Sequence, residues 1–423
     1  MLLKIPASFC DQLPGAVAAL RHPGFRFLLS GQAVALMGTW VQGTAQRWLV
    51  LELTDSPWAV GLLGAVGGLP FLLFSFLGGW LADRVPRISV LLCAQGLVFF
   101  QALLLGILIH GHSISVLWIL ILVFLFGCGM AFEVPARQSL VFDLVGRDDI
   151  TNAVGLHSAV FNLARFAGPA VAGLLITTGN LAGCFYFKAF SAFLIITVLI
   201  YVKRKYLSAE KLTEKPAASG FMSSTTEIFK FARGNRIVRS VILIILSYGL
   251  LLLPYSVLVP SLGRDVLGLG AGEYGFLCSA NGMGALLGAV AAAIFSNAGR
   301  RERWWAGTII FPLTIAGLGF ASTIHQAAFL LFLSGIVMVT VSNSAVSLLQ
   351  LEVRDSQRGR IMGLFTTGFM GLFPAGCLIH GALAELLGVR MTLVTTATAA
   401  LLVILLIGKS LFRDGGLRSR SWP

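Results

Sequence analysis

The chain alternates a dozen long apolar stretches with short polar segments, and this pattern constrains its fold more than any other feature. Asp, Glu, Lys and Arg make up only 12% of the residues, and the mean hydropathy is +0.88. A soluble domain keeps about a quarter of its residues charged, whereas a bilayer core needs about 20 apolar residues per helix. Lipid offers no partner for the edge of a sheet, so helices are expected rather than strands. The sequence predicts an all-α membrane protein.

Breaks at charged residues, glycines and prolines divide the apolar sequence into twelve expected transmembrane helices. Their ranges are 27–50, 57–82, 88–110, 114–136, 152–178, 181–202, 238–262, 272–297, 304–324, 326–349, 361–387 and 389–412. A charged, polar stretch follows the sixth helix. It predicts an N-terminal six-helix bundle at 1–203, a cytoplasmic linker loop at 204–236, and a C-terminal six-helix bundle with a cytoplasmic tail at 237–423.

The placement of the basic residues indicates the topology of the chain. The formal net charge of +13 could suggest a nucleic-acid partner, but basic residues in short loops mark the cytoplasmic side of a membrane protein. Most of the 31 Lys and Arg residues lie in loops of one side, whereas Arg264 and Arg390 belong to the alternate loops. We therefore expect a multi-pass protein of the cell inner membrane, surrounded by the lipid bilayer, with both termini cytoplasmic and no nucleic-acid partner.

The sequence gives no sign of catalysis, a cofactor or a metal site. The six cysteines lack CxxC spacing and nearby histidines, so they are expected to be small buried side chains. No Gly-x-x-x-x-Gly-Lys motif for binding phosphate occurs. We expect no enzyme activity, no cofactor and no metal, and a chain that works as a monomer.

Related landmarks recur in the two halves of the chain. The sequence NAVGL at 152–156 opens the fifth expected helix, and RIMGL at 360–364 opens the eleventh. Further along, GPA at 168–170 is echoed by FPA at 373–375. Internal duplication of six-helix halves, with a site at their interface, is a transporter architecture.

The most specific motif is Gly79-Trp-Leu-Ala-Asp83-Arg84-Val-Pro86-Arg87, between the second and third expected helices. Gly79 permits close approach of helices, and Asp83 can hold an arginine or a helix N-terminus in one conformer only. We expect Gly79, Asp83, Arg84 and Arg87 to form a gate loop, with an ordinary solvated turn as the alternative. The motif resembles the loop signature of the major facilitator superfamily, with Pro86 where that family usually has glycine.

A second motif, ARFAGPAVAG at 164–173, lies in the fifth expected helix. Its small residues allow tight packing in lipid, and Pro169 bends the helix. The motif resembles the antiporter signature of the same superfamily at Gly168, Pro169 and Gly173, with alanine replacing two other glycines. The resemblance implies efflux, and ordinary packing of small residues is the alternative.

Further segments resemble the drug and siderophore exporter branch of that superfamily, including the enterobactin exporter family. They are HPGFR at 22–26, QRWLV at 46–50, VPARQ at 134–138, NLAR at 162–165 and QRGRIMG at 357–363. The resemblance covers nearly the whole chain. It implies two pseudo-symmetric six-helix bundles and secondary active transport by alternating access.

Few ionisable residues fall inside the expected helices, where each costs at least about 2.5 kcal/mol. Glu133 lies in the inner part of the fourth helix, four residues before Arg137, and Arg165 lies at mid-depth in the fifth. We expect Glu133 to exchange a proton, or to pair alternately with Arg137 and Arg165, as a cavity opens and closes. A fixed i,i+4 ion pair is the alternative. Lys188 in the sixth helix is expected to snorkel or to pair similarly.

Four polar residues, Gln32, Thr39, Gln42 and Gln46, share one face of the otherwise apolar first helix. A polar stripe at this depth must face protein or water, so we expect it to line a substrate cavity, with interhelical hydrogen bonding as the alternative. The other residues expected in this cavity are Trp40, Tyr248, Asn281 and Asn343.

These features predict a secondary active transporter that exports an amphiphilic small molecule, of siderophore or drug-like kind, in exchange for protons. A lysophospholipid flippase or a facilitator is the first alternative. A transport-dead membrane sensor or scaffold, which binds a cytoplasmic partner through the linker, is the second.

Overall fold

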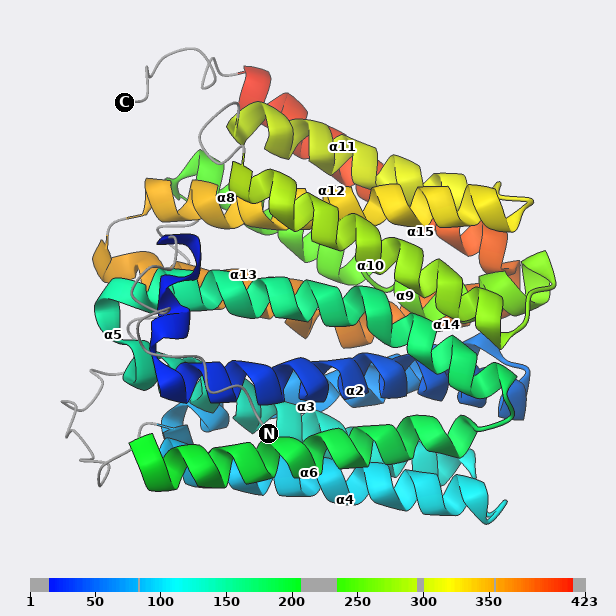
Figure 1. The fold of residues 1–423 in the computed structure, drawn as a ribbon. Coiled ribbons are helices and arrows are strands. Elements are labelled where there is room, and N and C mark those ends of the chain that lie inside the picture. Colours follow the sequence, from blue (N-terminus) through cyan, green and yellow to red (C-terminus); the bar gives the residue numbers. More distant parts are fainter. Residues whose placement is uncertain (1–14, 83, 207–233, 295–299, 354, 414–423) are drawn as a thin grey trace. The chain divides into compact units, whose positions relative to one another are not determined.

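The computed structural model describes residues 15–82, 84–206, 234–294, 300–353 and 355–413 (Figure 1). Within these ranges the chain forms helices and no strands. Nine helical segments of the described residues are long and apolar enough to cross a membrane, and one of them contains two of the expected spans. The all-α membrane fold predicted from the sequence is confirmed.

The first six expected spans correspond to five long helices. They are α2 (Pro23–Thr54), α3 (Pro57–Ala82), α4 (Arg87–His110), α5 (Val116–Thr177) and α6 (Leu181–Tyr206), preceded by the short 3-10 helix η1 (Gly15–Arg21). The fourth and fifth spans are the two helical parts of α5, which meet at a kink at Gly146. The φ of Gly146 is 74°, a left-handed conformation that glycine adopts without a steric penalty.

The last six expected spans contain more interruptions. The seventh is divided into α8 (Arg236–Ser247), η2 (Tyr248–Leu252), α9 (Tyr255–Ser261) and η3 (Leu262–Val266). The others are α10 (Ala271–Ile294), α11 (Arg300–Leu318), α12 (Ile324–Glu352), α13 (Asp355–Gly371), α14 (Phe373–Leu387) and α15 (Val389–Arg413). The breaks lie beside Pro254 and Pro374, because proline has no N–H for the helical hydrogen bond and its ring clashes with the preceding turn.

The chain forms two compact units. The first consists of Met1–Leu49 and Leu69–Thr213, and the second of Val50–Gly68 and Glu214–Pro423. The main division falls inside the expected linker at 204–236, most of which lies outside the described residues, so the exact domain bounds stay a prediction. In addition, the connection between α2 and α3 packs with the second unit.

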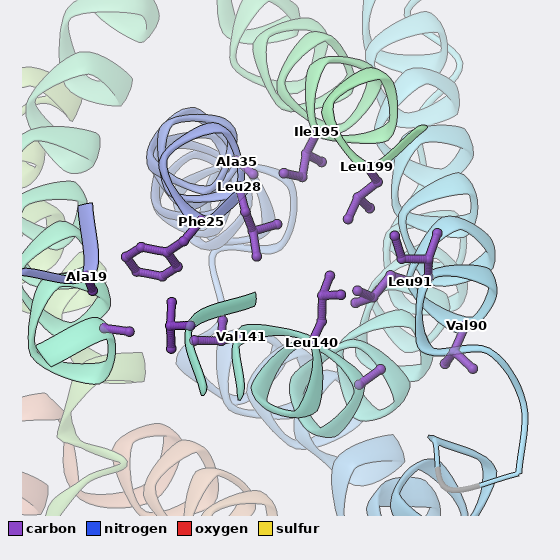
Figure 2. Close-up of a cluster of buried hydrophobic side chains, with 14 residues drawn as sticks. Ala19, Phe25, Leu28, Ala35, Val90, Leu91, Leu140, Val141, Ile195 and Leu199 are labelled. Atoms are coloured by element: carbon purple, nitrogen blue, oxygen red, sulfur yellow. The ribbon is translucent and has the colours of Figure 1, made fainter. Parts of the chain in front are cut away.

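The first unit has a buried apolar core near the N-terminal end of α2. It gathers side chains from η1, α2, α4, α5 and α6 (Figure 2). Phe25 and Leu28 of α2 are each 1% exposed, and Leu140 of α5 is fully buried among them. The core joins helices that are far apart in the sequence. It fixes the position of α2 along its axis relative to α5 and α6.

Glycines seven residues apart bring α2 against α6. A Cβ at Gly31 would lie 2.8 Å from Ile195 Cδ1, and a Cβ at Gly38 would lie 2.3 Å from Ser191 Oγ. Gly24 continues the same line, because seven residues are about two helical turns. Small residues let two backbones approach closely in lipid, and the stripe thereby positions the polar residues of α2 beside α6.

Candidate functional site

One pair of buried charges in the first unit lies on α5. Glu133 Oε1 is 3.5 Å from Arg137 Nε, and the two side chains are 7% and 11% exposed. Arg137 also donates a hydrogen bond to Nε2 of His157, so it links the parts of α5 before and after the turn at Gly146. The Glu133–Arg137 pair is the i,i+4 arrangement that the sequence left open as an alternative. Exchange of a proton at Glu133 stays a prediction.

Arg165 lies beside α2, with its guanidinium carbon 5.6 Å from the centroid of the Trp40 ring. The two helices approach closely here, because a Cβ at Gly168 would lie 2.5 Å from Trp40 Cβ. Pro169 and Gly173 are buried in the same helix. The motif at 164–173 therefore contains a close helix contact, and its relation to efflux stays a prediction.

The polar face of α2 takes part in hydrogen bonds with α4. Gln42 donates to Gln46 Oε1 at 3.3 Å and to Gln101 Oε1 at 3.2 Å, and Gln101 donates back to Gln42 Oε1 at 3.2 Å. Gln32 is also buried, at 3% exposed. This is the interhelical hydrogen bonding that the sequence left open beside a cavity lining. The role of these amides in binding a substrate stays a prediction.

Thr39, on the same face of α2, contacts a buried cation. Lys188 Nζ of α6 donates to Thr39 Oγ1 at 2.9 Å and to Ala35 O at 3.3 Å. The pairing expected for Lys188 is thus made with neutral oxygen atoms of α2.

The expected gate loop connects α3 to α4. Asp83 lies outside the described residues. Arg84 lies 4.0 Å from the centroid of the Trp80 ring, and Arg87 forms an ion pair with Asp143 of α5. The loop is therefore tied to two helices of the first unit through its arginines.

The close approach expected at Gly79 occurs one residue earlier. A Cβ at Gly78 would lie 2.5 Å from Ala131 O of α5, whereas a Cβ at Gly79 would meet nothing within 4 Å. Both positions are glycine, and the rotation of α3 about its axis decides which of them faces α5. That rotation depends on packing that the local sequence does not encode.

In the second unit, the residues expected in the cavity have different surroundings. Tyr248 is fully buried, and its hydroxyl donates to Thr308 O at 3.3 Å. Asn281 donates to Tyr255 OH at 2.8 Å. Asn343 is exposed on α12. Among the residues that the structure describes, no group of three or more His, Cys, Asp or Glu is placed to hold a metal ion.

One charged cluster was not predicted as a site. It joins the α2–α3 connection to the rest of the second unit: Arg264 lies 2.9 Å from Asp55 Oδ1 and donates to Leu51 O at 2.9 Å. Nearby, Ser56 donates to Glu385 Oε2 at 2.9 Å. The sequence does contain a signal for this cluster. Basic residues are scarce in the alternate loops, so an arginine at position 264 is unusual there. We call these residues the Arg264 cluster.

The segment just before α2 is also anchored by charge. Asp149 accepts two hydrogen bonds from Arg21, each of 2.9 Å, and one from His22 of 2.7 Å. Ala19 N donates to Asn152 Oδ1 at 2.9 Å. The HPGFR segment at 22–26 is therefore held at the turn of α5, where Phe25 enters the apolar core (Figure 2).

Comparison with known proteins identifies relatives over almost the full length. The family model for transmembrane secretion effectors matches residues 14–415. The staphyloferrin A transporter of Staphylococcus aureus (strain NCTC 8325 / PS 47) is 22% identical over 371 residues, which is 87% of this chain and 91% of the relative. The enterobactin exporter EntS of Shigella boydii serotype 18 is 28% identical over 393 residues, which is 92% of this chain and 90% of the relative.

Solved transporter structures share the fold. A crystal structure of a POT family transporter in complex with a thioalcohol-conjugated peptide has a TM-score of 0.73 at 12% identity, and covers 93% of this chain and 96% of that chain. A bacterial homologue of the iron transporter ferroportin, in an inward-facing state, has a TM-score of 0.70 at 17% identity, with 91% and 98% covered. Since the family model spans nearly the whole sequence, the chain belongs to the transmembrane secretion effectors, a family of major facilitator transporters that includes siderophore exporters.

Proposed function

We propose that this transporter exports an amphiphilic small molecule, of siderophore or drug-like kind, across the cell inner membrane in exchange for protons. The observation that carries the proposal is the buried Glu133–Arg137 pair of α5, in a chain whose relatives include siderophore transporters. Ionisable residues at membrane depth are costly, and they commonly mark ion or substrate pathways. We further propose that the protein works as a monomer with both termini in the cytoplasm.

Coupling would take place at Glu133, with Arg137 and Arg165 as the cations that it meets in different conformers. In the structure Glu133 pairs with Arg137, and Arg137 also bonds His157 of the following helical segment. A movement of that segment would change the positive charge near Glu133. A carboxylate whose charged neighbours move takes up a proton in one conformer and releases it in the other.

Alternating access would use two charged contacts as gates. The Arg264 cluster lies within the second unit, where it holds the α2–α3 connection, and we assign it to the outer side. The gate loop with Asp83, Arg84 and Arg87 would hold the cytoplasmic side in the opposite conformer. Substrate would enter along the polar face of α2, where the amides of Gln42 and Gln101 exchange partners as the path opens.

A panel of ligands tests the substrate class. Purified protein is heated with siderophores, including iron-free enterobactin and staphyloferrin A, with antibiotics and with lysophospholipids. A ligand at about 100 times its Kd stabilises the protein by about 2.7 kcal/mol, which raises the unfolding temperature. Stabilisation by lysophospholipids alone identifies a flippase, and no response to any class favours the sensor or scaffold alternative.

A transport assay tests proton coupling. In proteoliposomes, a gradient of one pH unit supports about tenfold accumulation of substrate for each proton exchanged. We expect wild-type protein to accumulate the substrate and Glu133→Gln to reach only equal concentrations on both sides. Glu302→Gln, an exposed glutamate of α11, is the matched control and keeps wild-type accumulation. Full accumulation by Glu133→Gln would exclude this carboxylate as the coupling group.

A second variant tests the gate loop. Asp83→Asn removes the carboxylate of the gate loop. Loss of an interaction of about 1 to 2 kcal/mol would change the ratio of the two conformers by about 5- to 30-fold. We expect slower transport with unchanged insertion and yield, while Asp148→Asn, an exposed aspartate of the turn in α5, keeps the wild-type rate. Wild-type rates for well-inserted Asp83→Asn contradict the gate.

A further inference from the structure

Lys188 is an enclosed amine that the coupling residues above do not include. It is 2% exposed, and Nζ donates to Thr39 Oγ1 at 2.9 Å and to Ala35 O at 3.3 Å. Gly38 holds α2 against α6 at this level, because a Cβ there would lie 3.2 Å from Lys188 Cα. The amine therefore occupies a fixed site between two tightly packed helices.

This site suits Lys188 with or without its extra proton. An ammonium group has three N–H donors, whereas the neutral amine has two, and the site offers two oxygen acceptors that are both uncharged. The charged form gains only a cation–π contact with Phe126, whose ring centroid is 5.9 Å from Nζ. Since no carboxylate among the described residues forms an ion pair with Lys188, neither protonation state is fixed by direct contact.

One carboxylate lies on the face of α5 that meets Lys188. Phe126 of α5 is beside Lys188, and Glu133, which pairs with Arg137, is seven residues or about two turns further along the same face of the helix. Two cations therefore share one anion. When Arg137 holds Glu133 closely, the ammonium form of Lys188 is stabilised less, and when Arg137 moves away it is stabilised more.

Other charged groups of the helices around Lys188 lie elsewhere. On α2, Arg47 is eight residues beyond Thr39, or about 12 Å along the helix. On α4, His110 contacts the ring of Tyr186, which is about 200° around α6 from Lys188. On α5, Arg165 lies over Trp40. His157 of α5 contacts Arg137, so Glu133, Arg137 and His157 form the group whose rearrangement can change the charge of Lys188.

We propose that Lys188 carries the transported proton, with Glu133 as its counter-ion. In the transfer, one Nζ–H bond of the ammonium breaks, the electron pair stays on nitrogen, and the proton passes to water admitted in the open conformer; reprotonation is the reverse. Because Lys188 is enclosed, its amine cannot contact a substrate group, which would need an exposed amine. A proton is small enough to reach it. The inference rests on the proton coupling proposed above but assigns the proton itself to Lys188 instead of Glu133. It explains why Glu133→Gln would uncouple transport: without the anion, Lys188 stays neutral throughout the cycle.

A spectroscopic test needs no substrate. Protein labelled with ¹³C at lysine Cε is titrated in detergent micelles, and the Lys188 signal is identified by its absence in Lys188→Gln and in Lys188→Arg. We expect this signal to change from the ammonium to the amine position between about pH 6 and 9, as buried lysines can. We also expect the change to occur at a different pH in Glu133→Gln. A Lys188 signal that stays at one position over the whole range overturns the proposal.

Transport variants separate this inference from the proposed function. With iron-free enterobactin as the transported compound, Lys188→Gln should lose the response to a pH gradient but keep downhill flux, and Lys203→Gln on the same helix should keep both. Lys188→Arg, which cannot release its proton, should also lose the gradient response. Accumulation at the wild-type level by Lys188→Gln overturns the role of Lys188. Absence of a gradient response in wild-type protein instead overturns proton coupling, while the titration still decides whether Lys188 exchanges a proton.

Discussion

At the scale of single residues, the buried Glu133–Arg137 pair both stabilises and destabilises the fold. Removing two ions from water costs several kcal/mol each, and their attraction repays this only when the geometry is good. The distance of 3.5 Å between Glu133 and Arg137 is long for a direct hydrogen bond. The pair is therefore suited to exchanging partners, and loss of one member is more harmful than loss of both.

We expect Arg137→Met to lower stability by about 3 kcal/mol, because it leaves Glu133 buried without its cation. The double variant Glu133→Leu/Arg137→Met should recover most of this loss, since no uncompensated charge remains. Unfolding temperatures in detergent measure both, with Arg147→Met, at an exposed arginine of α5, as the control. Equal loss in the single and double variants contradicts the argument.

The sequence predicts the partner of Glu133 but does not predict the partner of Lys188. Glu133 and Arg137 could be paired from their spacing, because residues four apart on one helix are neighbours in any fold. The partner of Lys188 could not, because Thr39 is 149 positions away and the contact depends on how α2 and α6 pack. The polar stripe of α2 was visible in the sequence, but the helix that meets it was not.

At the scale of elements, glycines decide which helices can touch. In the second unit α10 and α12 lie side by side (Figure 1). A Cβ at Gly284 would lie 1.9 Å from Phe332 O, and a Cβ at Gly335 would lie 2.2 Å from Asn281 O. Each glycine thus faces backbone atoms of the other helix. Such atoms cannot move aside as the end of a flexible side chain can.

We expect Gly284→Ala to destabilise the second unit by about 1 to 3 kcal/mol, because α10 and α12 must separate to admit the methyl group. Gly363→Ala on α13, where a Cβ would meet nothing within 4 Å, is the control. It should leave stability unchanged or raise it by up to about 1 kcal/mol through better helix propensity. Thermal unfolding of the two variants is the measurement, and a similar effect of both would refute the packing argument.

The existence of the helices could be predicted, but only some of their interruptions could. Apolar length indicates a span, since the bilayer thickness sets it. Pro254 and Pro374 mark two of the breaks. The π-helical turns at Tyr248–Leu252 and Leu262–Val266, and the helical conformation of 137–145 up to the kink at Gly146, have no such marker. Such details carry no periodic signal.

At the scale of the whole molecule, the charge asymmetry of the loops makes a prediction about orientation. The α4–α5 connection contains His112, whereas the turn in α5 contains Arg147 and Arg21 lies beside Asp149 at that turn. Basic residues are retained on the cytoplasmic side during insertion. The two connections should therefore face opposite sides of the membrane.

Reporter fusions test this orientation. Alkaline phosphatase, which folds only outside the cytoplasm, should be active when fused after His112 and inactive when fused after Arg147. Green fluorescent protein at Pro423 should fluoresce, because the C-terminus is expected in the cytoplasm. The opposite pattern at all three positions would reverse the assignment of inner and outer sides and of the two gates.

The hydrogen bonds made by α2 also set an order of events during synthesis. Gln101, the hydrogen-bond partner of Gln42, is synthesised 59 residues later, and Lys188, the partner of Thr39, is synthesised 149 residues later. At a synthesis rate of about 5 to 20 residues per second, the second interval lasts about 7 to 30 s. Through that time the first helix is in the membrane with polar groups whose final partners do not yet exist. The nascent chain must therefore keep α2 near the insertion machinery, or in contact with water, until α6 emerges.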